Sequence, residues 1–168
     1  MTVTCRWASG PSEARAASEL LTQLMRLDEA YISHSEVRWG LSPDGRHWAN
    51  DAGEQLEGYL AWVRGSDDTE LAVATVDEAL AAAAVVTWEL DKPGRVATLQ
   101  DVVVDPEQRG HGVGAALLRF VEAEALERGC RWLMLESGVR NARAHAFFER
   151  AGLEVVSHTF AKPLGGTS

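Results

Sequence analysis

The chain has 168 residues, of which 46% are hydrophobic and 24% are charged, and its formal net charge is −9 at pH 7. This length suits one domain with a sizeable core. The acidic balance argues against nucleic acid as a partner, because a phosphate backbone binds a basic face. It favours a cationic small molecule through long-range attraction.

No part of the sequence approaches the roughly 18–20 consecutive apolar residues that a membrane span needs. The first residues also lack a basic region followed by an apolar stretch. We therefore expect a cytoplasmic protein that does not bind membranes. Cys5 and Cys130 are far apart and in no metal-ligand spacing, which predicts reduced thiols and no metal site.

The first third of the chain predicts a strand, a helix, an irregular region and a second helix. Residues 3–8 alternate as a strand does, and Ser12 is the expected N-cap of a helix over residues 13–27. Residues 28–50 are interpreted as a loop with room for a short helix, and residues 51–63 as an amphipathic helix. The expected apolar face of the first helix consists of Ala16, Leu20, Leu24 and Leu27.

The middle of the chain predicts three successive strands joined by short turns, which form an antiparallel meander. These strands cover residues 69–76, 80–90 and 95–104. The alanine run over residues 79–84 favours a helix by propensity. Its position inside the meander favours a strand instead, and we assign it so.

The strongest functional signal lies between residues 99 and 127. A short β-branched strand ends at Asp105-Pro106, and the sequence Arg109-Gly-His-Gly-Val-Gly114 then opens a helix over residues 112–128. The alternating glycines leave backbone N–H groups bare at a helix start, where these donors have no internal partner. Such a site binds phosphate or pyrophosphate.

The last third predicts a strand, a helix, a strand and a tail. Residues 131–136 are expected to run parallel to the strand before the glycine-rich loop, because a helix lies between the two strands. A helix over residues 141–151, a final strand over residues 153–162 and a flexible tail over residues 163–168 follow. The whole chain, 1–168, is thus expected to form one α+β domain, with a mixed, mostly antiparallel six- to seven-stranded sheet and helices on both faces.

Two phosphate-containing ligand classes compete for the glycine-rich loop. Gly110, Gly112 and Ala115 fit the weak dinucleotide fingerprint G-x-G-x-x-A, and Glu136 stands where a ribose-binding acid could lie. Residues 105–109, however, separate the loop from its strand, and a meander replaces the alternating strands and helices of a dinucleotide-binding fold. A dinucleotide-dependent enzyme is therefore only a remote alternative.

Two segments resemble the GNAT superfamily of N-acetyltransferases. The pattern V-x-P followed by R-G-x-G-x-G is similar to the acetyl-CoA-binding segment of that family. Residues 141–153, which read N-A-R-A-H-A-F-F-E-R-A-G-L, resemble its N-x-x-A-x-x-F-Y-x-x-x-G-F segment. The order of the predicted elements also fits the GNAT fold over nearly the whole chain. The resemblance implies an α/β sandwich of GNAT type and acetyl-CoA as the acetyl donor, with CoA as the product.

The resemblance also implies where the cofactor lies. The pantetheine arm would occupy a wedge between the strand ending at Val104 and the strand starting near Arg131. Backbone groups of Val102 and Val104 would pair with the arm, and one N–H group would polarise the thioester carbonyl.

The pyrophosphate would then lie on the amides of residues 109–114, with added charge from Arg109 or His111. Asn141 would hydrogen-bond to the cofactor arm, although an asparagine at this position serves equally well as a helix N-cap. The expected cofactor-binding residues are Val102, Val103, Val104, Arg109, Gly110, His111, Gly112, Val113, Gly114, Asn141 and Phe148.

Two departures from the family pattern concern proton transfer. Phe148 stands where many members carry a tyrosine that protonates the departing thiolate, and Thr98 stands where some members carry a glutamate as general base. Neither residue can fill these roles. The remaining candidates for catalysis are Asp101, Ser137 and His145. Each also has a structural interpretation, as a strand-face acid, a turn residue and a packing histidine respectively.

We therefore predict an acetyl-CoA-dependent N-acetyltransferase that acts on a primary amine in a ternary complex, because neither cysteine lies in a setting typical of a nucleophile. The expected acceptor is a small amine, with a protein amine as the next choice. A non-catalytic acyl-CoA-binding or acyl-CoA-sensing protein of the same fold is the alternative, and the family suggests a homodimer. Four residues of the loop region either line the acceptor pocket or fill an edge of the core: Tyr31, Trp39, His47 and Trp48.

Overall fold

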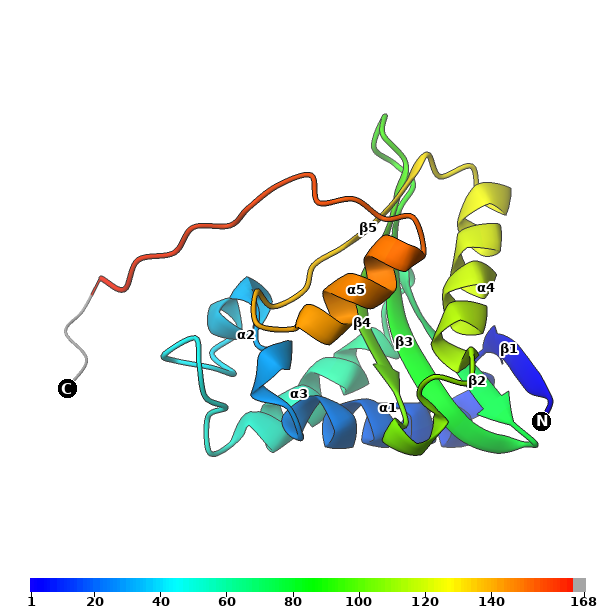
Figure 1. The fold of residues 1–168 in the computed structure, drawn as a ribbon, viewed down its shortest axis with the longest axis horizontal. Coiled ribbons are helices and arrows are strands. Elements are labelled where there is room, and N and C mark those ends of the chain that lie inside the picture. Colours follow the sequence, from blue (N-terminus) through cyan, green and yellow to red (C-terminus); the bar gives the residue numbers. More distant parts are fainter. Residues whose placement is uncertain (165–168) are drawn as a thin grey trace.

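A computed structural model describes residues 1–164, which form one mixed sheet with helices on both faces (Figure 1). The strands are β1 (Val3–Trp7), β2 (Thr69–Val76), β3 (Ala79–Glu89), β4 (Val96–Val104) and β5 (Trp132–Leu135). The helices are α1 (Gly10–Arg26), η1 (Glu29–Tyr31), α2 (His34–Arg38), α3 (Ala52–Val63), η2 (Pro106–Gln108), α4 (Val113–Glu127) and α5 (Ala142–Arg150). Within residues 1–164, no helix is both long and apolar enough to cross a membrane.

The strand order follows the sequence, β1-β2-β3-β4-β5. The first three pairings are antiparallel, and β4 pairs with β5 in parallel. The predicted meander and the parallel crossover through α4 are thereby confirmed, and the alanine run does lie in a strand. Asp77 and Glu78 form the turn between β2 and β3 with φ angles of +47° and +74°, as a two-residue hairpin turn requires.

The sheet has five strands, so the expected six or seven strands are wrong. Residues 153–162, the predicted last strand, adopt no strand and pair with no part of the sheet. A strand needs a neighbour to satisfy its backbone donors and acceptors, and this segment leaves the end of α5 and runs away from the sheet (Figure 1). Of the predicted tail, residues 165–168 lie outside the described part of the chain.

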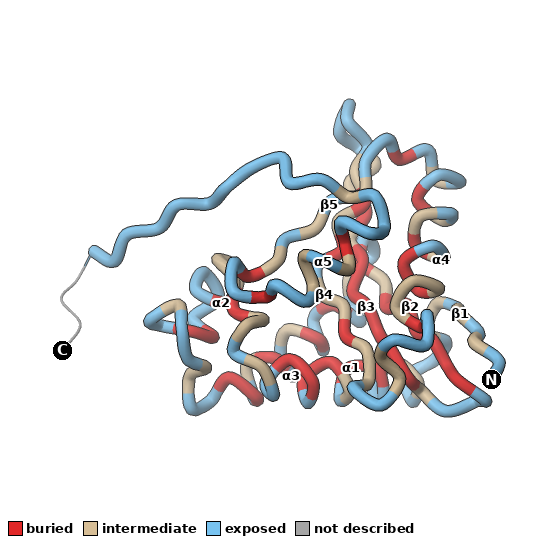
Figure 2. Tube along the Cα trace, in the orientation of Figure 1, coloured by how far each residue is buried: buried red, intermediate tan, exposed pale blue. Residues whose placement is uncertain are grey.

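Alternating strand residues divide the interior into two cores, one on each face of the sheet, as the buried segments in Figure 2 show. One core packs α4 and α5 against strand residues such as Ala74, Ala84 and Leu99. The other packs α1 and α3 against Val73, Val85 and neighbouring residues. Small side chains at the centre of β2 and β3 let helices approach both faces closely.

Helix α1 begins earlier than the sequence predicts, at Gly10, with Ser9 rather than Ser12 in the N-cap position. Pro11 fits the first turn because the missing N–H is not needed there. The Glu13 carboxylate reaches back and accepts a hydrogen bond from the Ser9 N–H at 2.7 Å. The Glu13 side chain, in the first turn of α1, thus satisfies the backbone N–H group of the N-cap residue Ser9.

The buried face of α1 also differs from the expected one. Ala16 and Leu27 are exposed, whereas the residues that pack against the sheet lie at neighbouring positions with the same helical spacing. The fully or almost fully buried apolar residues of α1 are Ala17, Leu21, Leu24 and Met25.

Candidate functional site

Strand β4 has one complete edge and one edge that is only half paired. It pairs with β3 along most of its length, but β5 pairs with it only from Val96 to Leu99. Asp105 N donates to Ala81 O on the β3 side. Because neighbouring residues of an antiparallel pair alternate in direction, the backbone groups of Val102 and Val104 point to the opposite, free edge. An extended ligand can pair with β4 there.

Both carbonyl groups on this free edge accept hydrogen bonds from side chains. The Tyr31 hydroxyl donates to Val102 O, and Arg109 Nε donates to Val104 O at 3.1 Å. The N–H groups of Val102 and Val104 face the same edge, past the last pair of the β4·β5 ladder. Val103 faces away from it, because its backbone points to β3 and its side chain is 1% exposed in the core under α1 and α3.

A β-bulge on β4 lies directly before this edge. Val86 pairs with Leu99 and Val85 pairs with Asp101, so Gln100 is the extra residue. A bulge re-aims the side chains beside it. Gln100 and Asp101 consequently line the same pocket, although consecutive residues of a regular strand would face opposite sides of the sheet.

The pocket beside the bulge has a volume of about 360 Å³ and opens to solvent. Helices α1, α2 and α3 form its walls, and β4 contributes the bulge. Its lining residues are Met25, Ser35, Glu36, Trp39, Leu41, Gln55, Leu56, Gly58, Tyr59, Trp62, Gln100 and Asp101. The pocket therefore combines two carboxyl groups with three large aromatic side chains.

Asp101 is the titratable group of this pocket. Burial and the negative charge of Glu36 raise its pKa to about 7, and a hydrogen bond with Tyr59 opposes part of this increase. At neutral pH the carboxyl group therefore exists in both protonation states. Such a group can accept a proton from an alkylammonium ion and later release it.

Glu36 is the second carboxyl group of the pocket, on α2. Its side chain is 7% exposed, and its Oε2 atom accepts hydrogen bonds from Ser33 N and Ser33 Oγ, both at 2.7 Å. This is a capping box at the start of α2. The same carboxylate thus orients a short helix and makes the pocket favourable for a cation.

Three aromatic rings form a row along the pocket. The ring centroids of Trp39 and Tyr59 lie 6.3 Å apart, as do those of Tyr59 and Trp62. Trp39 and Trp62 are 64% and 62% exposed, so their faces are available to a ligand. Aromatic faces attract cations, which agrees with the charge of the pocket.

Of the four aromatic and histidine residues predicted for the acceptor pocket, only Trp39 lines it. Trp48 packs against the core under α1 and α3, and Tyr31 packs beside the same core with its hydroxyl at Val102. His47 lies on an exposed loop and contacts Asp44 through Nδ1 at 2.7 Å. The sequence analysis did not assign Glu36, Tyr59 or Trp62 to the site. The spacing of Tyr59 and Trp62, three residues apart on one helix, is a signal that could have found them.

The glycine-rich loop has the geometry of an anion site. Gly110 and Gly112 have φ angles of +81° and +82°, and a Cβ atom added to either would meet nothing within 4 Å. Helix α4 starts at Val113, and the N–H groups of its first turn have no partner within the helix. A Cβ on Gly114 would lie 3.1 Å from Val104 Cγ2, so this glycine lets the helix pack against β4.

Helix α5 carries Asn141, His145 and Phe148, and Ser137 lies before it. Asn141 is the N-cap, and its Oδ1 accepts a hydrogen bond from Ala144 N at 3.2 Å. Phe148 is 8% exposed in the core, beside Phe147 at a centroid distance of 5.2 Å. Ser137 and His145 are half-buried. In residues 1–164 no hydrogen bond joins either of them to Asp101, so the three predicted catalytic residues do not form a hydrogen-bonded relay.

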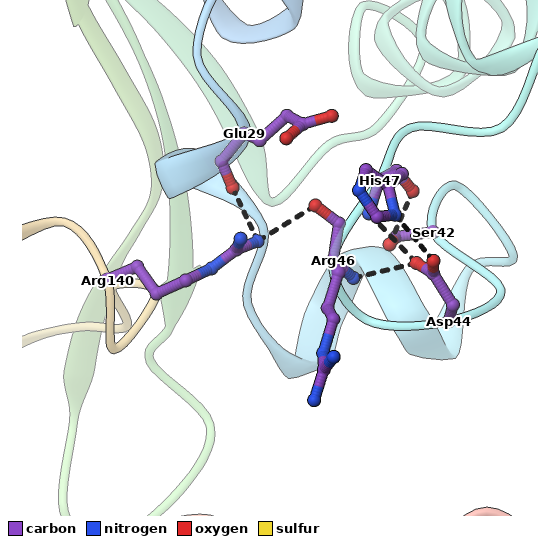
Figure 3. A network of polar contacts seen from close by, with 6 residues as sticks. All are labelled: Glu29, Ser42, Asp44, Arg46, His47 and Arg140. Carbon is purple, nitrogen blue, oxygen red and sulfur yellow. Dashed lines mark hydrogen bonds and ion pairs between the residues drawn. The ribbon is translucent and has the colours of Figure 1, made fainter.

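The segment after β5 is locked to the segment that carries the pocket walls. Arg140 Nη2 donates to Glu29 O at 3.0 Å and to Arg46 O at 2.9 Å (Figure 3). Asp44 closes the adjoining loop, because it accepts from the backbone N–H groups of Arg46 and His47, both at 2.8 Å. The side-chain hydrogen bond with His47, together with these two backbone hydrogen bonds, holds the pKa of Asp44 well below its usual range. The loop 136–143 is therefore tied to the region 28–47 by hydrogen bonds.

Comparisons with known proteins agree with this geometry. Residues 19–153 match the model of the acetyltransferase (GNAT) family. The chain is 35% identical over 126 residues to aminoglycoside N(6')-acetyltransferase type 1 of Stenotrophomonas maltophilia, an alignment that covers 71% of this chain and 77% of that protein. Aminoalkylphosphonate N-acetyltransferase of Salmonella typhimurium is 32% identical over 69 residues, which cover 41% of this chain and 45% of that protein.

The fold is also similar to solved structures. The structure of AAC(6')-Iy in complex with the bisubstrate analogue CoA-S-monomethyl-acetylneamine has a TM-score of 0.67. Its sequence is 16% identical, and the match covers 99% of this chain and 100% of that chain. At this identity the likeness concerns the fold.

The close contact between Gly138, in the loop after β5, and the backbone of residues 30–32 yields a prediction about stability. In Gly138→Ala, the new Cβ would overlap the backbone oxygens of Ile32 and Ala30, the latter at 2.5 Å. Because neither oxygen belongs to a flexible side chain, we expect a loss of about 1–3 kcal/mol in the free energy of unfolding. Chemical denaturation measures it. The control Gly58→Ala, with nothing within 4 Å of the new Cβ in α3, should be stabilising, because alanine favours a helix over glycine. Equal effects of the two substitutions would contradict the tight junction.

Proposed function

Because the chain belongs to the GNAT family of acetyltransferases, it is an acetyl-CoA-dependent N-acetyltransferase, and we propose that its acceptor is the primary amine of a small cationic molecule. The position of Asp101 carries this proposal. Asp101 lines the aromatic pocket and directly precedes Val102, whose backbone faces the free edge of β4. An amine held at Asp101 therefore lies beside the strand edge that we assign to the acetyl donor.

The donor half of the site fits CoA in two respects. The open space at Gly110 and Gly112 admits a pyrophosphate close to the backbone, at the positive end of the α4 dipole. The N–H groups of Val102 and Val104 can pair with an extended arm. When bound, acetyl-CoA supplies an activated acetyl thioester. One of the two N–H groups would then stabilise the oxyanion that develops on the thioester carbonyl.

The acceptor half removes a proton. An alkylammonium ion has no lone pair, so it must be deprotonated before it can attack. Asp101, with its pKa raised to about 7, would accept that proton directly or through one water. Glu36 and the row Trp39, Tyr59 and Trp62 would attract the cationic acceptor and hold its carbon skeleton. Two relatives are named for small-molecule amines, aminoglycosides and aminoalkylphosphonates, which supports a small-molecule acceptor here. Of the two, the aminoglycosides are the polycationic class that the charge of this pocket favours.

We assign the reaction to direct attack in a ternary complex. Neither cysteine lines the pocket, and burial raises the pKa of the Cys5 thiol, which disfavours a nucleophilic thiolate. Cys130 is buried in the core beside α4. Neither cysteine is therefore placed to carry a covalent acetyl group.

We assign the proton donor for the departing thiolate to Tyr31 rather than to Ser137 or His145. Phe148, in the position of the usual tyrosine, has no hydroxyl group. The Tyr31 hydroxyl lies at the free edge of β4 through its hydrogen bond to Val102 O. Burial and the charge of Asp101 raise the pKa of Tyr31 above its usual value, so the hydroxyl group stays protonated at neutral pH and would donate a hydrogen bond to the sulfur as negative charge develops there.

The acceptor class can be tested by measuring thiol release from acetyl-CoA. We expect release to increase with small primary amines that carry a further positive charge, and to remain at background with matched neutral or acidic amines. Peptides that present an N-terminus or a lysine form the comparison set. Turnover with such peptides, and none with free small amines, would contradict the proposal.

The role of Asp101 predicts both a rate and a pH dependence. The carboxylate is the active form, so kcat/KM should rise with pH through an apparent pKa of about 7 and then level off. Asp101→Asn cannot accept a proton, and we expect kcat to fall by about 10²–10⁴-fold. Asp67→Asn, in the exposed turn before β2, is the matched control and should match the wild type.

A second variant tests the same assignment without removing the base. Tyr59→Phe loses the hydrogen bond that lowers the pKa of Asp101. The rising limb of the pH profile should therefore move to higher pH, while the plateau rate remains close to that of the wild type. An unmoved limb would show that a group other than Asp101 titrates.

Tyr31→Phe tests the proton donor. Because the thiolate would leave without a proton, we expect kcat with acetyl-CoA to fall by about 10²-fold or more, with little change in KM for acetyl-CoA. An acetyl thioester of a more acidic thiol releases a more stable thiolate, which depends less on a hydrogen-bond donor. The variant should therefore lose less activity with that donor. An equal loss with both donors would indicate that Tyr31 only positions β4.

A further inference from the structure

Gly58 is a wall residue of the aromatic pocket that has no side chain. It lies in the interior of α3, where glycine lowers helix stability relative to alanine. A Cβ atom added to it would meet nothing within 4 Å, and its φ angle is not in the left-handed region. Neither backbone strain nor the close approach of another segment therefore requires a glycine at this position. What the missing side chain provides is open space in the pocket.

Helix α3 has two different faces. One face packs its small and aliphatic side chains into the core under α1 and α3. The other face lines the pocket with residues spaced three or four apart: Gln55, Gly58, Tyr59 and Trp62. Helical side chains lean toward the N-terminus of their helix, so the Trp62 ring leans over the turn that contains Gly58. We call the open space beside this ring the Gly58 slot.

The Gly58 slot is continuous with the expected position of the reacting amine. The Tyr59 hydroxyl group forms a hydrogen bond with the Asp101 carboxyl group, and the Tyr59 backbone is next to Gly58 in the helix. The phenol ring of Tyr59 thus spans the distance between the carboxyl group and the slot. A carbon skeleton that follows this ring from an amine at Asp101 reaches the open space at Gly58.

We propose that Gly58 is a specificity-determining residue, whose slot takes a ring-shaped carbon skeleton attached to the acceptor amine and is left unfilled by a straight alkyl chain. This inference rests on the proposed function of the pocket as the acceptor site. The pocket volume of about 360 Å³ lies within the range of roughly 300–1,000 Å³ that is typical of sites for drug-sized molecules. A straight chain would leave much of this space without contacts, and such contacts are lost outright across a gap.

The side chains around the slot fit a cationic ring. Trp39 and Trp62, on either side of Tyr59, are both exposed, and their faces offer a ring a larger contact area than a straight chain can cover. Such faces also attract a positive charge carried by the ring. The Gln55 amide on the same helix face can hydrogen-bond with a polar substituent.

Binding of two matched diamines to the full chain tests the inference. The trans para isomer of diaminocyclohexane and hexamethylenediamine each have six carbon atoms and two primary amines, so they differ mainly in shape. Calorimetry measures the Kd of each, and we expect the wild type to bind the ring diamine more tightly. In Gly58→Leu the new side chain fills the slot, so binding of the ring diamine should weaken by about 10-fold or more, while the Kd of the straight diamine changes little.

A control separates the slot from a general effect of a larger side chain on α3. Ala61→Leu adds the same side chain at an exposed position that does not line the pocket, and it should bind both diamines as the wild type does. Gly58 is exposed and leucine favours a helix, so both variants should fold, which circular dichroism checks. No preference of the wild type for the ring diamine, or an equal change for both diamines in Gly58→Leu, would overturn the inference.

Activity with the same diamines distinguishes this inference from the proposed function. We expect the wild type to acetylate the ring diamine with the higher kcat/KM, and Gly58→Leu to lose that advantage chiefly through a higher KM. If the two diamines bind with the expected difference but neither is acetylated, the slot is supported and the acceptor role of the pocket is contradicted. If both are acetylated and Gly58→Leu lowers kcat/KM equally for both, the pocket keeps its role and the specificity assigned to Gly58 is wrong.

Discussion

The incomplete pairing of β4 is the constraint on which the rest of the site depends. A strand that kept its partner along its whole length would have no free backbone group, and a strand without any partner would not hold its shape. β4 meets both needs, because β3 pairs with it beyond the bulge while β5 leaves it after Leu99. The bulge at Gln100 then turns Asp101 into the pocket beside the free edge. One irregularity of a single strand thus brings the proposed acceptor pocket next to the strand edge that we assign to the acetyl donor.

The electrostatics of the pocket follow from the same arrangement. The Asp101 carboxyl is partly desolvated by the helices packed on the sheet, and it lies near a second carboxylate that a capping box holds in place. Desolvation and like charge both favour the protonated form. The acid is consequently tuned by residues of α2 and α3, which lie 40 residues or more before it in the chain. The raised pKa of Asp101 therefore depends on the helices packed beside β4 and not on the sequence of β4 itself.

Local patterns in the sequence predict most of the fold. The hydrophobic periods predict the meander, the parallel crossover and the helices, and the glycine spacing predicts an open loop with left-handed glycines before α4. The sequence analysis fails where a feature depends on distant partners. Residues 153–162 have the composition of a strand but pair with no strand within residues 1–164. Glu36, Tyr59 and Trp62 stay hidden because only the folded chain places them around Asp101.

The lock between Arg140 and the backbone oxygens of Glu29 and Arg46 has a consequence for how such a protein can change over evolutionary time. The walls of the acceptor pocket come from residues 25–62, whereas the donor edge and the glycine-rich loop come from residues 99–114. The lock uses main-chain oxygens, which every substitution preserves. Side chains of the pocket walls can therefore be exchanged, and new amines accepted, while the machinery that handles the acetyl donor is inherited intact.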